Sequence, residues 1–503
     1  MDSKSPGQAR PPSPGRGGGW AWTARSAALA LALAAALAAV ARPPHSPSVL
    51  LLVADTLRAD RLGSYGYPLP TSPRLDALAA ESVLYEAALT PAPFTMPAVA
   101  GLMTGRYPET VGVANHSRAD ALAGEAHTLA EAAAGAGYRR AAVVSNPWLA
   151  RPAMGFSQGF DVFVTAKRLG VSPPARLDAT AVTDIALDLL ADISTSDQPF
   201  LLWVHYMDTH MPYNAPAELA AQFGNPSATS RVLADFVDPD DDRQRIYFEP
   251  NYTAGELEDT RRVYDAAVHY VDREIGRLLD RMKELGIYDE AIIIFVSDHG
   301  ESLGEHGLFF AHDFTLYQEL VHVPMMIRAP GTQPGRVSSV VSLLDVLPTL
   351  CARTALACPK ATDGANLLAT PPRLSRFAAS APLRKRYRLN PWAERPGLAG
   401  RTSLLRSGNI KLLRFPLTEG LRYEAYNLAE DPGERRNIYD PGHFLSERVE
   451  LDAWLEDMRQ RRAPRTRNPG ALDRETVGRL RSLGYLDGPS NGERAGGRSA
   501  PAK

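Results

Sequence analysis

The hydrophobic pattern of this chain is marked by short runs of aliphatic residues that each end abruptly in polar side chains. Four such runs cover residues 48–53, 140–144, 199–204 and 291–296. Continuous apolar runs of this length are typical of strands buried on both faces, as in a parallel sheet between layers of helices. In such sheets ligands bind just beyond the carboxyl ends of the strands. We therefore expect the polar residues after the runs to line one shared site.

These polar residues have the chemistry of a metal site. They are Asp55, Asn146, His205, Asp208, His210, Asp298 and His299. Each could be an ordinary loop residue after a core strand, but several carboxylates and imidazoles at the ends of one sheet favour a common function. Carboxylate oxygens and imidazole nitrogens are usual ligands of divalent cations. The pattern therefore predicts a metal site at this edge of the sheet.

Amphipathic segments alternate with the apolar runs from about residue 48 to residue 350. The predicted helices cover residues 73–82, 128–137, 179–191 and 255–285. A further strand is expected at 323–328, and a strand-to-helix passage at 340–350. This alternation predicts an α/β fold with a large mixed, mostly parallel sheet flanked by helices.

The composition changes after residue 370, which indicates a second folding unit. Residues 371–401 are rich in proline and arginine, residues 402–427 alternate like short strands with turns, and residues 446–462 are amphipathic. We expect a small C-terminal α+β subdomain with a short antiparallel sheet. The predicted division is a targeting segment at 1–45, a catalytic α/β domain at 46–370, the C-terminal subdomain at 371–487 and a disordered tail at 488–503.

The N-terminal segment resembles a targeting sequence. Residues 1–25 are rich in proline and glycine, and residues 26–41 are an almost unbroken stretch of alanine, leucine and valine that ends in a small-x-small cleavage pattern. A cleaved signal peptide and an uncleaved transmembrane anchor both fit, because the stretch is slightly short for a membrane span. In both cases we expect an exported protein, in the periplasm or the extracellular space.

Charge and cysteine content limit the remaining possibilities. The formal net charge of the 503 residues is −2, so the overall charge does not call for nucleic acid or another polyanion. The two cysteines are Cys351 and Cys358. In an exported protein they could form a local disulfide, and two buried free thiols are the alternative.

A threonine near a predicted helix is the candidate nucleophile. Residues 95–106 predict a helix that opens at Pro97, which places Thr95 at its N-terminus. The free N–H groups and the dipole of a helix favour an anion there. Thr95 could be only an N-cap, but with acids and histidines converging, a nucleophile is the better interpretation. A cation bound to the hydroxyl would ease the loss of its proton.

Several motifs together resemble the sulfatase family of the alkaline phosphatase superfamily. They lie at residues 53–66, 71–76, 102–108, 297–307, 316–319, 426–433 and 483–486. They occur in the order of that family and span about residue 48 to residue 486. The resemblance implies an alkaline phosphatase-like fold for the main domain.

The resemblance also implies a role for individual residues. One divalent ion, Ca²⁺, Mn²⁺ or Zn²⁺, is expected on Asp55, Thr95, Asp298 and His299. The catalytic residues fall on Thr95, His210 and His312, and the substrate contacts on Asn146, His210 and His312. His306 is a second candidate for the position assigned to His312.

The departures from the family pattern bear on the chemistry. Sulfatases with a formylglycine nucleophile need cysteine or serine at position 95 and arginine at position 99, whereas this chain has Thr95 and Val99. Threonine resembles instead the nucleotide phosphodiesterases and the phosphoglycerol or phosphoethanolamine transferases, which pass phosphoryl groups through a threonine ester. Thr56 replaces an acid of the family pattern.

The expected function is that of a metal-dependent hydrolase that cleaves a sulfate or phosphate ester through a Thr95 intermediate. A transferase of the phosphoglycerol or phosphoethanolamine type and a catalytically silent glycan-binding protein stay open as alternatives. The expected substrate is a small-molecule, glycan or lipid ester, with membrane anchoring through residues 26–41 as an open possibility.

Overall fold

The computed structural model describes residues 46–114, 120–166, 176–224, 252–312, 315–368, 375–379, 400–417 and 419–463. The chain divides after Ser46 into two units, and the architecture below belongs to the second. The predicted targeting segment, including residues 26–41, and the predicted tail at 488–503 lie outside the described residues. Within the described ranges, no helix has the length and apolar character needed to cross a membrane.

A central sheet organises the second unit, and nine strands belong to it among the described residues. Their order is β11-β2-β10-β6-β1-β5-β3-β4, with β9 beside β2. The strands are β1 (Val49–Ala54), β2 (Val83–Leu89), β3 (Arg139–Val144), β4 (Val162–Thr165), β5 (Phe200–Tyr206), β6 (Ile292–Ser297), β9 (His322–Val323), β10 (Met325–Arg328) and β11 (Gly335–Ser342). The pairs β1–β5, β1–β6, β3–β5, β3–β4 and β2–β11 are parallel, and β10 and β9 run antiparallel to their neighbours. The predicted mixed, mostly parallel sheet is confirmed.

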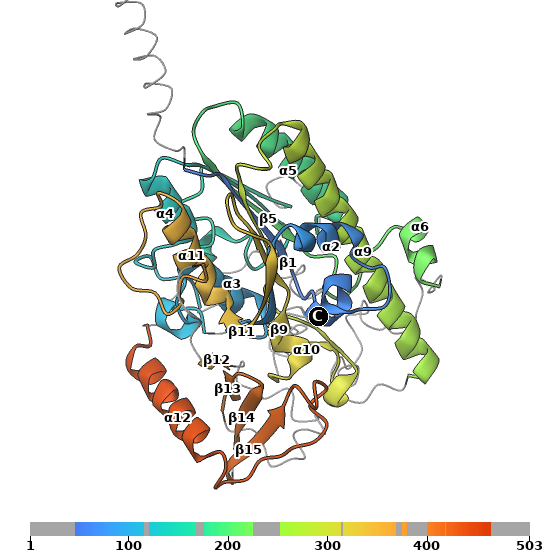
Figure 1. Ribbon diagram of the computed structural model, residues 1–503, viewed down its shortest axis with the longest axis vertical. Helices are drawn as coiled ribbons and strands as arrows, with labels where there is room; N and C mark the ends of the chain where they lie inside the picture. The colour runs from blue at the N-terminus through green and yellow to red at the C-terminus, as the bar shows by residue number, and fades with distance from the viewer. Residues whose placement is uncertain are drawn as a thin grey trace, which may run out of the picture. The chain divides into compact units, whose positions relative to one another are not determined.

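Two layers of helices cover the sheet (Figure 1). One face packs against α3 (Thr95–Thr104), α4 (Leu129–Gly135) and α11 (Val346–Arg353). The other packs against α2 (Pro73–Ala80), α5 (Ala179–Ile193) and the long α9 (Ala254–Glu284). Helices therefore bury the central strands on both faces. Because successive side chains of a strand point to opposite faces, every position of these strands is buried, which explains their continuous apolar sequences.

The helix boundaries lie close to the predicted ones. The capping boxes of Thr128 with Glu131 and of Thr253 with Glu256 begin α4 and α9. One prediction was wrong in detail, because α3 begins at Thr95 and not at Pro97. A proline in the first turn costs no helical hydrogen bond, so the helix can start before it. Sequence analysis did not predict β2 and β4.

A second, antiparallel sheet follows the central one along the chain. Its strands are β12 (Ser375–Ala379), β13 (Ser403–Ser407), β14 (Ile410–Leu417) and β15 (Gly420–Asn427), in that order. The helix α12 (Leu445–Gln460) packs on it through Leu451, Trp454 and Met458. The expected small C-terminal sheet is therefore present, while the domain limits at 370 and 487 stay predictions.

Cys351, on α11, and Cys358 form a disulfide. Of the two alternatives that the sequence left open, the structure therefore has the bonded form.

Candidate metal and ester-transfer site

Four parallel strands bring polar side chains to one face of the sheet at their carboxyl ends. The last core residues on this face are Val53, Val144, Trp203 and Val296, which all belong to one hydrophobic cluster. Two residues after each of these, in the same order, come Asp55, Asn146, His205 and Asp298. Since residues two apart share a face of a strand, the sequence spacing itself aims these four side chains the same way.

Two buried carboxylates form the centre of the site. Asp55 and Asp298 are fully buried. Asp55 Oδ2 accepts a hydrogen bond of 2.7 Å from Asn146 Nδ2, and Asp298 Oδ1 accepts bonds of 3.2 and 2.9 Å from the backbone N–H groups of Thr56 and His299. The other oxygens, Asp55 Oδ1 and Asp298 Oδ2, have no hydrogen-bond partner in the described part of the chain. Both lie 3.5 Å from His299 Nε2.

Burial sets the protonation of these groups. It raises the pKa of Asp298 to about 7, and it raises the pKa of Asp55 well above the ordinary value, with Asp298 adding repulsion. Two neighbouring carboxylates without water or a cation are costly in a protein interior. The arrangement therefore calls for a positive charge between them.

His299 presents a nitrogen lone pair to the same space. Its Nδ1 lies 2.9 Å from the Gly300 carbonyl oxygen, so Nδ1–H donates to that oxygen and Nε2 stays free of a proton. Burial, and then the neighbouring His312, lower the pKa of His299 to about 4. A neutral imidazole held through its other nitrogen is the usual form of a metal ligand.

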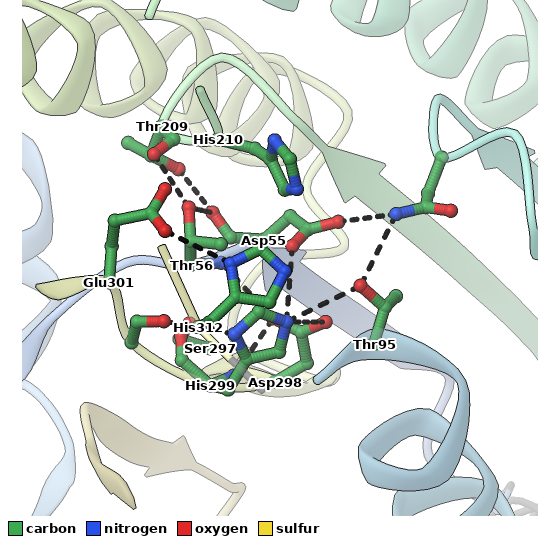
Figure 2. Close-up of polar contacts among 12 residues, drawn as sticks. Asp55, Thr56, Thr95, Thr209, His210, Ser297, Asp298, His299, Glu301 and His312 are labelled. Atoms are coloured by element: carbon green, nitrogen blue, oxygen red, sulfur yellow. Dashed lines mark hydrogen bonds and ion pairs between the residues drawn. The ribbon is translucent and has the colours of Figure 1, made fainter. Parts of the chain in front are cut away.

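Thr95 faces this group from the first turn of α3 (Figure 2). The residue is fully buried, and its Oγ1 lies 3.3 Å from His299 Nε2. Asn146 Nδ2 donates to Thr95 Oγ1 at 3.3 Å as well as to Asp55. The backbone N–H of Trp148 donates to Asn146 Oδ1, which fixes the amide so that its NH₂ faces the site. The hydroxyl therefore lies beside the carboxylates in a prearranged position.

His210 and His312 flank the site from another side. Their ring centroids are 5.0 Å apart, and the His312 ring is 4.5 Å from that of His299. Glu301 Oε1 lies 2.9 Å from His312 Nδ1, and the Met211 carbonyl oxygen lies 2.6 Å from His210 Nδ1. Both contacts hold the ring in place through Nδ1.

The residues fit a divalent cation. Ligand atoms of Asp55, His205 and Asp298 all lie within 4.8 Å of one another, the one such group of three found among the described residues. His299 and Thr95 adjoin it at the distances given above. Two carboxylate oxygens without hydrogen bonds, neutral imidazoles and a hydroxyl suit a divalent metal ion of intermediate hardness.

The seven residues to which the resemblance gave a role all come together here. They are Asp55, Thr95, Asn146, His210, Asp298, His299 and His312. The second candidate for the His312 position, His306, lies elsewhere: its Nδ1 is 2.9 Å from Glu319, and its ring stacks on Tyr317 at 3.7 Å. Thr56 has a structural contact, because its hydroxyl donates to the Thr209 carbonyl oxygen at 2.6 Å while its N–H holds Asp298.

Sequence reasoning counted His205 among the polar residues at the strand ends but gave it no role of its own, and it missed Glu301. Both are fully buried next to the predicted groups. The position of His205 on the same strand face as Asp55 and Asp298 was a usable signal. For Glu301 the only sequence signal was its position just after Ser297–Gly300, and the residue spacing did not indicate a contact with His312.

Comparison with known proteins agrees with this geometry. A sequence model of the family named Sulfatase matches residues 47–355. A second, described as N-sulphoglucosamine sulphohydrolase, C-terminal, matches residues 304–461. The uncharacterised sulfatase YidJ of Escherichia coli K12 is 25% identical over 461 residues, which cover 83% of this chain and 88% of that protein.

Human iduronate 2-sulfatase is 26% identical over 392 residues, which cover 62% of this chain and 70% of its own. Among solved structures, the phosphonate monoester hydrolase of Agrobacterium radiobacter superposes with a TM-score of 0.63 at 23% identity, covering 84% of this chain and 97% of that one. That likeness shows a common fold.

Proposed function

Because the chain belongs to the sulfatase family, it is a hydrolase of sulfuric or phosphoric esters, and we propose that it works through a covalent ester on Thr95 with one divalent metal ion. The observation that carries this proposal is the position of Thr95 Oγ1. It lies 3.3 Å from both His299 Nε2 and Asn146 Nδ2, at the start of α3 and beside two carboxylates that each have an oxygen without a hydrogen bond in the described part of the chain.

Asp55, Asp298 and His299 would hold the ion, with the Thr95 hydroxyl as a further ligand. When bound, such an ion lowers the pKa of a hydroxyl and neutralises charge that develops on the transferred group. Asn146 orients Thr95 through its amide, and it also hydrogen-bonds Asp55, so the nucleophile and a ligand share one support. This arrangement fixes the direction of attack before the substrate arrives.

The reaction then takes two steps. In the first, the Thr95 hydroxyl passes its proton to the adjacent Asp298 carboxylate, and Oγ1 forms a bond to the sulfur or phosphorus atom as the bond to the leaving oxygen breaks. His312, backed by Glu301, gives a proton to the leaving oxygen. His210 lies beside His312 as a neutral imidazole, because burial holds its pKa well below the ordinary value. In the second, water loses a proton to His312 and attacks the same atom, which releases the Thr95 oxygen, and Asp298 returns the proton to that oxygen.

The chemical class of the transferred group follows from the nucleophile. A formylglycine sulfatase releases sulfate from a hydrated aldehyde, and threonine cannot form one. A threonine ester must be cleaved by attack at sulfur or phosphorus itself. We therefore propose a phosphate or phosphonate ester as the preferred substrate. The named activity of the phosphonate monoester hydrolase relative supports this choice, and the sulfatase relatives make a sulfate ester the competing one.

The test is a substrate panel with the purified full chain. Metal-depleted protein is assayed on an aryl sulfate, a phosphomonoester, a phosphodiester and a phosphonate monoester, before and after addition of Ca²⁺, Mn²⁺ or Zn²⁺. We expect turnover only with metal, fastest on a phosphorus ester. Turnover that withstands chelation contradicts the metal site, and exclusive cleavage of the sulfate contradicts the substrate class while leaving the site intact.

We also propose that residues 1–41 direct export. The disulfide between Cys351 and Cys358 supports an oxidising compartment, since such bonds are rare in the cytosol. Fusion of residues 1–41 to a reporter that is active only outside the cytoplasm should give a signal, and fractionation then separates a released product from an anchored one. A silent reporter would remove this proposal.

A further inference from the structure

A buried histidine on β5 takes no part in the mechanism above. His205 stands near the carboxyl end of that strand, fully buried, and pairs in register with Val53 on β1 and with Val144 on β3. Along β5, Leu201 and Trp203 share its face of the sheet, whereas Leu202, Val204 and Tyr206 lie on the other. The imidazole therefore interrupts an apolar face at the level where β1 ends in Asp55.

The ring has no partner that explains its burial. Neither His205 Nδ1 nor His205 Nε2 makes a hydrogen bond within the described ranges. Buried polar side chains are nearly always hydrogen-bonded, because an unpaired polar group loses the free energy of its hydration. The His205 ring meets the Trp203 ring edge-on, with centroids 6.1 Å apart, and this contact does not replace the hydrogen bonds that the imidazole would make to water. A histidine that served only to fill the core would be poorly suited to this position.

The nearest polar atoms belong to the two central carboxylates. His205 Nε2 lies 3.8 Å from Asp55 Oδ2, and the ligand atoms of His205, Asp55 and Asp298 are mutually within 4.8 Å. A cation placed among these atoms would satisfy an oxygen of each acid and a nitrogen of His205 at once. The same cation would lie next to His299, whose Nε2 is 3.5 Å from both acids.

We infer that His205 is a ligand of the ion, so that the site has two imidazoles and selects a transition metal such as Zn²⁺ or Mn²⁺ over Ca²⁺. Ca²⁺ takes oxygen ligands almost exclusively, whereas imidazole suits Zn²⁺ and its neighbours. This inference rests on the proposed metal-dependent function and adds to it the class of ion. It also assigns β5 a direct contribution that the family motifs in this sequence did not mark.

X-ray absorption of the zinc-loaded full chain tests the inference without any substitution. The multiple-scattering pattern of bound imidazole reports how many histidines contact the metal. Two imidazoles are expected, from His205 and His299. A single imidazole would overturn the role of His205 and leave the proposed function standing. Failure of the chain to retain any metal would overturn both.

A substitution separates ion classes. His205→Ala should weaken binding of Zn²⁺ and Co²⁺ by at least the roughly 10–100-fold that the loss of supporting groups around a metal site costs. Binding of Ca²⁺ should stay unchanged, and the visible spectrum of the Co²⁺ protein should shift. His322→Ala is the matched control, a partly buried histidine on β9 whose Nε2 contacts the Glu86 carbonyl oxygen. Equal Zn²⁺ affinities and equal Co²⁺ spectra for the wild-type chain and His205→Ala would contradict the inference, and if the variant does not fold, the absorption experiment decides.

Discussion

Replacement of Thr95 separates the chemistry of this site from its stability. Thr95→Ala removes the hydroxyl and one methyl group, whereas Thr95→Ser removes the methyl group alone. The two variants therefore differ by the hydroxyl. If Thr95 is the nucleophile, Thr95→Ala should lose almost all turnover, and Thr95→Ser should keep a measurable part of it, because an oxygen remains at the start of α3.

The structure limits the cost to folding. Thr95 is fully buried, so loss of its methyl group costs about 1 kcal/mol. The contacts of its hydroxyl with His299 and Asn146 are long, at 3.3 Å each, and Asn146 keeps its 2.7 Å hydrogen bond to Asp55 when that hydroxyl is gone. A second cost of about 1 kcal/mol is therefore an upper estimate for the lost hydrogen bond. A total of about 2 kcal/mol is small beside the ~5–15 kcal/mol that stabilises a typical folded protein.

The effect on rate is far larger. Removal of a covalent nucleophile from a prearranged site costs roughly 10⁴–10⁶-fold in kcat. The assay is steady-state turnover on the best substrate of the panel, together with thermal unfolding of each variant and rapid acid quench with mass spectrometry. Wild-type protein should carry a phosphoryl or sulfuryl group on a peptide that contains Thr95, Thr95→Ser should carry it at the same position, and Thr95→Ala should carry none.

One result would refute the covalent mechanism. If Thr95→Ala folds, binds metal and turns over within tenfold of the wild-type rate, water must be the attacking group.

Three further predictions concern the metal site, the His312–Glu301 pair and the disulfide. Burial raises the pKa of Asp298 to about 7, so the folded, metal-free protein holds a proton that the unfolded chain loses above about pH 4. The free energy of unfolding of the metal-free protein should therefore fall by up to about 4 kcal/mol as the pH rises from 4 to 7. Unfolding measured with and without metal should show that the stabilisation by the ion grows over the same pH interval. Glu301→Gln keeps the shape but cannot support a charged His312, so kcat should drop roughly 10²-fold with a changed pH–rate profile, and an unchanged profile would exclude proton transfer by this pair. Cys351→Ser should lower the free energy of unfolding by about 2 kcal/mol, as expected for a short closed loop, with kcat unaffected; denaturant titration and the standard assay measure the two effects.

The central strands and the convergence of their ends could be predicted from the sequence. Strands buried on both faces must be apolar at every position, and parallel strands end at one edge of a sheet. Asp55, Asn146 and Asp298 follow such apolar runs, so the sequence pattern alone predicted that their side chains would lie close together. Thr95 was a candidate from its place at the start of a predicted helix, and the resemblance to the sulfatase family then assigned both Thr95 and His210 to the site. No sequence period states how far a helix or a loop residue lies from the sheet.

Other features depended on the tertiary structure. β10 inserts antiparallel between β2 and β6, and no local pattern states which neighbours a strand will have. His306 and His312 lie on one short segment and are chemically alike, yet only His312 reaches the site. His306 lies in the turn between β7 (Ser302–Leu303) and β8 (Phe309–Ala311), where its side chain contacts Glu319.

His205 shows the same limit from the opposite side. Its neighbours in the sequence are those of a core strand, and its role depends on the carboxylate oxygens that other strands place beside it. The sequence by itself determined which residues could ligate a metal and on which strand faces they stand. The pairing of those faces, and with it the ligand set and the partner of each histidine, was decided by the packing of distant segments, since a side chain's electrostatic surroundings are a property of the fold and not of its neighbours along the chain.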